Sequence, residues 1–118
     1  MKRVLIADDA IFMRIALKTI LERNGFEIVG EAEDGAIALE KYKLLRPDII
    51  TLDITMPVMD GLEALKQIKA FDKNAKVMMI SAMGQETIVR EAVMLGAIGF
   101  VIKPYKEETI AKAFSKLL

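Results

Sequence analysis

The stretch Asp48-Ile-Ile-Thr-Leu52 is a short, nearly continuous apolar run that leads directly into a second acid, Asp53. A run without polar alternation is typical of a strand buried on both faces of a parallel sheet. Similar short runs recur before and after it along the chain. We therefore expect five strands, at residues 3–7, 27–29, 48–52, 76–80 and 99–102.

The segments between these runs have the 3.6-residue period of amphipathic helices. We expect helices at residues 11–24, 34–45, 62–68, 88–95 and 110–117. In the first helix, the pattern predicts a buried face of Phe12, Ile15, Ala16 and Ile20 and a solvent face of Arg14, Lys18 and Glu22. Five strand–helix repeats with short connections predict an α/β fold, a parallel sheet with helices on both faces, as one domain over residues 1–118.

Composition excludes several classes of function. The 17 Lys and Arg residues balance 17 Asp and Glu residues, so no net charge attracts nucleic acid or an anionic membrane. The chain has no cysteine and no histidine, which excludes disulfides, thiol chemistry, a Ser/His triad and a histidine-ligated zinc site. No apolar stretch approaches the roughly 18 residues of a membrane span, and we expect a cytoplasmic protein.

Five polar residues fall where predicted strands end. Asp8 and Asp9 follow the first strand, Asp53 the third, Ser81 the fourth and Lys103 the fifth. In an open α/β sheet the carboxyl ends of the strands form the ligand crevice. These residues, distant in sequence, are therefore predicted to meet at one edge of the sheet.

Each of these residues also has a simpler interpretation. A single aspartate or serine after a strand is most often a helix N-cap, and a single lysine is most often a solvated charge. Three carboxylates at one edge, however, repel one another unless a proton or a cation compensates them. Hard oxygen ligands of this kind suit Mg²⁺. A carboxylate beside Mg²⁺ can accept a phosphoryl group, with Lys103 and Ser81 to neutralise and hydrogen-bond its oxygens.

Four motifs together resemble one family along the whole chain. They are Asp8-Asp9, Asp53-Ile-Thr-Met-Pro-Val-Met-Asp-Gly61, Ser81-Ala82 and Lys103-Pro104. The chain is similar to the receiver domains of two-component response regulators, and more narrowly to the stand-alone chemotaxis regulators of motile bacteria. The resemblance implies a flavodoxin-like sheet with strand order 2-1-3-4-5, in which the first and third strands flank the topological switch point.

The resemblance also implies roles for individual residues. Asp53 corresponds to the phosphoacceptor, and Asp9 and Asp53 to direct Mg²⁺ ligands, with Asp8 assisting and the backbone carbonyl of Thr55 as a further ligand.

Three further residues correspond to the phosphoryl contacts and the switch of the family. Lys103 corresponds to the lysine that pairs with the phosphoryl oxygens, and Ser81 to the hydroxyl that moves onto them. Phe100 takes the place of the switch aromatic, where many relatives carry tyrosine; Tyr105 lies on the wrong side of the Lys-Pro pair for this role.

The partners implied are a histidine kinase, a flagellar motor switch protein and a dedicated phosphatase. The expected protein is a monomer that catalyses only its own phosphorylation and dephosphorylation, and so is not an enzyme toward other substrates.

Three rival functions have sequence requirements of their own. A phosphohydrolase with an aspartate nucleophile would carry that residue after the first strand and an acidic pair late in the chain, the reverse of the order here. A flavin-binding protein would need a glycine- and hydroxyl-rich loop after the first strand, where this chain has acids. A receiver from a longer regulator with a DNA-binding output domain is the third, although the end of the chain directly after the last predicted helix favours a stand-alone protein.

Overall fold

The computed structural model describes residues 1–118 and contains five strands that alternate with five helices. The strands are β1 (Lys2–Ala7), β2 (Phe26–Ala32), β3 (Ile49–Leu52), β4 (Val77–Ser81) and β5 (Gly99–Ile102). The helices are α1 (Ile11–Arg23), α2 (Gly35–Leu45), α3 (Gly61–Phe71), α4 (Glu86–Met94) and α5 (Glu107–Ser115). All strand pairs are parallel and the order is β2-β1-β3-β4-β5, which confirms the predicted fold class.

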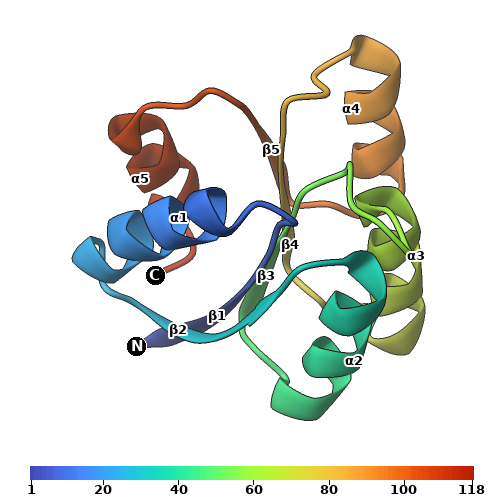
Figure 1. The fold of residues 1–118 in the computed structure, drawn as a ribbon, viewed down its shortest axis with the longest axis horizontal. Coiled ribbons are helices and arrows are strands. Elements are labelled where there is room, and N and C mark those ends of the chain that lie inside the picture. Colours follow the sequence, from blue (N-terminus) through green and yellow to red (C-terminus); the bar gives the residue numbers. More distant parts are fainter.

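The helices form one layer on each face of the sheet, with α1 and α5 on one side and α2, α3 and α4 on the other (Figure 1). Each face has its own apolar core. Leu5, Ile50 and Leu65 belong to the core under α2 and α3, whereas Ile6 and Phe114 belong to the core under α1 and α5. The central strand β3 is buried at every position, as its sequence predicts. None of the helices has the length and apolar character needed to cross a membrane.

Strand β2 is longer than the predicted 27–29, because it pairs with β1 from Phe26 to Ala32. It is an edge strand, so only Phe26 and Ala32 of its seven residues are buried, and the apolar signal is weak. The register shifts between Val4 and Leu5, opposite Gly30. A Cβ at Gly30 would lie 2.9 Å from the side chain of Leu45, so the glycine allows α2 to pack closely.

The buried face predicted for α1 is right at Ile20 and wrong at its other three residues. Phe12 is 83% exposed and Ile15 is 54% exposed, and Ala16 is exposed as well. The residues that α1 buries are Leu17, Ile20 and Leu21. Apolar residues occupy most of the circumference of this helix, so its period alone could not show which stripe faces the sheet and α5.

Candidate functional site: an acidic cluster at the carboxyl edge of the sheet

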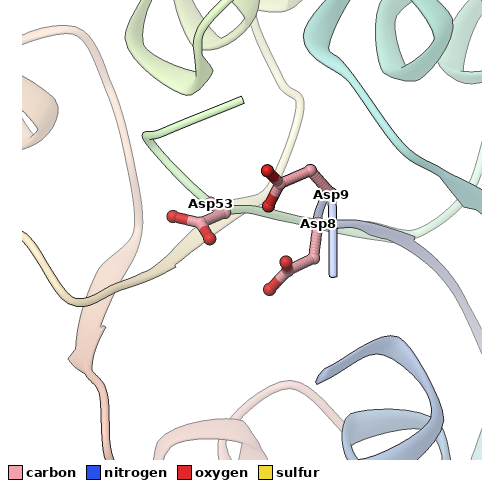
Figure 2. Close-up of side chains that lie close together, drawn as sticks. All are labelled: Asp8, Asp9 and Asp53. Carbon is pink, nitrogen blue, oxygen red and sulfur yellow. The ribbon is translucent and has the colours of Figure 1, made fainter. Parts of the chain in front are cut away.

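The predicted acids meet where β1 and β3 end. The amide of Asp53 donates to the carbonyl of Ala7 at 3.1 Å, which extends the pairing of these strands to the edge of the sheet. Carboxylate oxygens of Asp8, Asp9 and Asp53 all lie within 4.8 Å of one another (Figure 2). Asp8 and Asp53 are 6% and 8% exposed, whereas Asp9 is exposed to solvent. The site is therefore a buried acidic pair with a third carboxylate at its mouth.

Lys103 is the one side-chain cation that pairs with these carboxylates. It follows β5, and its Nζ donates to Asp8 Oδ2 at 2.6 Å and to Asp53 Oδ2 at 2.8 Å. Burial alone would lower the pKa of Lys103, but the hydrogen bonds and charges of Asp53 and Asp8 outweigh burial and raise its pKa. Lys103 therefore stays charged at neutral pH, and the cluster keeps a surplus of negative charge.

None of the three acids caps a helix. The N-cap of α1 is Ala10, which has no side-chain cap. Asp8 Oδ1 instead accepts from the amide of Ala10 at 2.9 Å, and the carboxylate of Asp9 makes no hydrogen bond within the protein. The capping interpretation of these residues is wrong.

The loop after β3 borders the cluster on the side of α3. The amide of Thr55 donates to Asp53 Oδ1 at 3.3 Å, and the backbone carbonyl of Thr55 accepts no hydrogen bond. The hydroxyl of Thr55 donates to the sulfur of Met83 at 3.2 Å, which joins the loops after β3 and β4. A Cβ at Gly61 would lie 1.9 Å from the carbonyl oxygen of Asp53, so only glycine fits there.

Ser81 and Phe100 occupy different places. Ser81 is the last residue of β4, is 1% exposed, and accepts from the amide of Met83 at 3.2 Å. It does not cap α4, whose N-cap is Gln85. Phe100 pairs with Met79 in β4 and lies half-buried against the core on the α4 side. The structure thus places Ser81 at the edge of the sheet where the acids lie, at the end of β4. Phe100 lies two residues before the end of β5.

Arg14 lies elsewhere than the sequence predicts. The helical pattern predicts that it faces solvent, yet its side chain is only 13% exposed and Nη1 donates to the carbonyl of Asp8 at 2.7 Å. Met83, in the loop after β4, lies half-buried against the core and contacts Thr55. Only the position of Arg14, one helical turn after the acids, could have indicated its place.

The donor set fits a hard divalent cation. Three carboxylates and an unengaged carbonyl at Thr55 are the oxygen ligands that Mg²⁺ prefers. Three like charges at this distance, with one lysine among them, also leave a charge that a cation would neutralise.

Comparison with known proteins agrees with this fold. The model of the response regulator receiver domain matches residues 4–115, and the chain belongs to this family. It is 53% identical to the chemotaxis protein CheY of Bacillus subtilis over 116 residues, 98% of this chain and 97% of the relative. It is 51% identical to CheY of Thermotoga maritima, again over 98% and 97% of the two chains.

A solved structure is similar along almost the entire chain. A chain in the crystal structure of the CheX–CheY–BeF₃–Mg²⁺ complex from Borrelia burgdorferi superposes with a TM-score of 0.94 at 42% identity. The match covers 99% of this chain and 90% of that one. The chain is thus closely related to CheY.

Proposed function

We propose that this chain is a Mg²⁺-dependent phosphoacceptor that takes a phosphoryl group from a histidine kinase onto Asp53. The observation that carries the proposal is the position of the Asp53 carboxylate. It is 8% exposed, lies within 4.8 Å of two further carboxylates, and is 2.8 Å from a lysine. A nucleophile placed in this way needs only a cation and a donor to react.

The reaction forms an acyl phosphate. An oxygen of Asp53 attacks phosphorus, the N–P bond of the kinase phosphohistidine breaks, and the ring nitrogen keeps the electron pair. Asp9, Asp53 and the carbonyl of Thr55 would hold Mg²⁺, with Asp8 assisting, and the ion would neutralise charge on the phosphoryl oxygens. Lys103 already contacts Asp53 and would pair with another of these oxygens.

We further propose that the same site removes the group by hydrolysis, so that the chain acts only on itself. The acyl phosphate adds roughly −1.5 to −2 units of charge and three acceptor oxygens. The Ser81 hydroxyl is a donor at the same edge, and at present it only accepts from Met83. Its movement toward the phosphoryl group would vacate space on the β4–β5 side, into which Phe100 can turn.

The surface that would respond lies over β5 and α5. An open groove there is lined by Phe100, Ile102 and Tyr105, and by Lys106, Lys112 and Lys116. We propose that this surface, together with α4, binds a cytoplasmic output partner. By analogy with the chemotaxis relatives, this partner is a flagellar motor switch protein. The CheX–CheY complex of the similar structure supports a dedicated phosphatase as a further partner.

Acetyl phosphate and Mg²⁺ test the acceptor. The wild type should gain one acid-stable, base-labile phosphoryl group, and Asp53→Asn should gain none. Asp60→Asn is the matched control, since Asp60 caps α3 and lies outside the cluster. A phosphopeptide that maps elsewhere in the wild type would contradict the assignment.

A second experiment tests the switch. Phe100→Ala should still be phosphorylated but should lose most of the difference in partner affinity between the free and beryllofluoride-bound forms, a difference of about 5–150-fold in the wild type. A variant that keeps the wild-type ratio would show that Phe100 only fills the core.

A further inference from the structure

The backbone between Asp8 and Asp9 depends on a residue of α1. The carbonyl of Asp8 and the amide of Asp9 belong to one planar peptide group, so the orientation of this group sets the position of the Asp9 Cα, from which the side chain extends. The amide of Asp9 makes no hydrogen bond, and the carbonyl of Asp8 accepts one, from Arg14 Nη1 at 2.7 Å. Arg14 is therefore the only hydrogen-bonding partner of the peptide that joins the two acids.

Asp9 has no other anchor within the protein. Asp8 is held by its amide, which donates to Ala32 at 3.0 Å, and by its carboxylate, which contacts Ala10 and Lys103. The carboxylate of Asp9 is exposed and makes no hydrogen bond. Its position within 4.8 Å of Asp53 therefore depends on the backbone that carries it and on its own rotamer, with no hydrogen bond to hold it.

Arg14 is itself held in place. Its Nε donates to Glu31 Oε1 on β2 at 2.9 Å, and its side chain is only 13% exposed. The guanidinium thus spans from an edge strand to the acid pair with two of its donors. A lysine has one point charge and cannot make both contacts in this fixed geometry.

We propose that Arg14 is a positioning residue, which fixes the Asp8–Asp9 peptide so that the Asp9 carboxylate faces Asp53 in the geometry that Mg²⁺ needs. The proposal rests on the function proposed above, because it assigns Arg14 a part in the same site. It also explains why a cation is buried beside a cation site. By charge alone Arg14 would weaken Mg²⁺ binding, so a favourable role must come from geometry.

The charge of Arg14 would weaken Mg²⁺ binding, whereas its positioning of the peptide would strengthen it, so variants can separate the two effects. Arg14→Met keeps an apolar stem but removes the charge and both donors, and Arg14→Lys keeps the charge but removes the fork. If position matters, both variants bind Mg²⁺ more weakly, by about tenfold, as is common when a group that orients a ligand is removed. If only charge matters, Arg14→Met binds more tightly and Arg14→Lys is unchanged.

Calorimetric titration with Mg²⁺ is the measurement, since the chain has no tryptophan to report binding. Arg90→Met is the matched control: it makes the same change of charge on α4, where Arg90 forms an exposed pair with Glu86. It should leave the Mg²⁺ affinity within about twofold. Titrations at about 0.05 M and 0.5 M salt add a further test, because loss of position persists at high salt while a charge effect is screened.

Urea unfolding in chelator distinguishes the positioning role of Arg14 from a purely structural one. A purely structural role would lower the free energy of unfolding and leave the Mg²⁺ affinity of the folded protein unchanged. Tenfold weaker binding by Arg14→Lys, the milder variant, supports the proposal. Binding by both variants at wild-type strength or tighter overturns it and leaves the proposed function standing. A wild type that binds no Mg²⁺ would instead overturn the proposed function, and this inference with it.

Discussion

Two sets of aspartates precede helices in this chain, and the structure uses them differently. Asp34 and Asp60 cap α2 and α3, accepting from the amides of Ile37 at 2.8 Å and Glu63 at 2.9 Å. Asp8 and Asp9 lie three and two residues before the start of α1 at Ile11, and the N-cap position itself holds Ala10, which has no capping side chain. The same residue type at a similar place in the sequence thus stabilises two helices and builds a site before the third.

The difference has a cost in stability. A missing N-cap is worth about 1 kcal/mol, and three crowded carboxylates add repulsion to it. Natural proteins break rules of local structure, such as N-capping, mainly at functional sites, where the loss of stability serves the function. Variants that remove an acid or a cap from either set, or that add a cap to α1, therefore test whether the acids before α1 serve a site.

The largest effect is expected at Gly61, where the capped helix α3 meets the acceptor. In Gly61→Ala the new Cβ would lie 1.9 Å from the carbonyl of Asp53, which is backbone and cannot move without the site. We expect a loss of about 3 kcal/mol in the free energy of unfolding. Urea denaturation measures it, and phosphorylation by acetyl phosphate should fall as well.

Gly99→Ala is the control for this variant. Its Cβ would meet the flexible end of Met78 at 2.8 Å, which can shift, so the cost should be much smaller. Equal losses for the two variants would show that Gly61 has no special relation to Asp53.

Mg²⁺ should distinguish the two sets of aspartates next. At a free concentration about a hundred times its Kd, Mg²⁺ should raise the free energy of unfolding of the wild type by about 2.7 kcal/mol. Asp9→Ala should gain much less, because it lacks a ligand. Asp34→Ala should keep the full gain, since Asp34 only caps α2. Denaturation with and without Mg²⁺ checks both, and an equal gain for Asp9→Ala would remove Asp9 from the metal site.

In chelator the order of these variants should reverse. Asp34→Ala should lose about 1 kcal/mol with its cap. Asp9→Ala should be as stable as the wild type or more stable by about 1 kcal/mol, because repulsion among the acids is relieved. The same urea experiments give both values. An Asp9→Ala protein much less stable than the wild type in chelator would favour a structural role for Asp9.

The smallest effect is expected when α1 receives the cap that it lacks. Ala10 is exposed and has the extended backbone of an N-cap, so Ala10→Ser should add about 0.5 kcal/mol. Thermal or urea unfolding in chelator measures the gain. Ala10→Asp should gain less than Ala10→Ser at low salt, since it adds a fourth carboxylate to the edge; a larger gain for aspartate would mean that repulsion there is unimportant.

The sequence by itself determined the fold class and the edge at which the site lies. Five short apolar runs require strands buried on both faces, and parallel strands place all their carboxyl ends, with Asp8, Asp53 and Lys103, at one edge. The ends of α1 and α4 are also local, because Gly25 and Gly96, two residues after these helices, adopt the positive φ that most other residues avoid. These features depend on residues close in the chain or on the geometry of any parallel sheet.

Only the tertiary structure decided how α1 is rotated and which aspartates cap. The helix has more apolar residues than one face can bury, so packing against the sheet and α5 selected Leu17 and Leu21 over Phe12 and left Phe12 in solvent. The same rotation turned Arg14 inward to Glu31 and the Asp8 carbonyl. A choice among several apolar stripes depends on the surfaces that meet them, and those surfaces come from segments far away in the sequence.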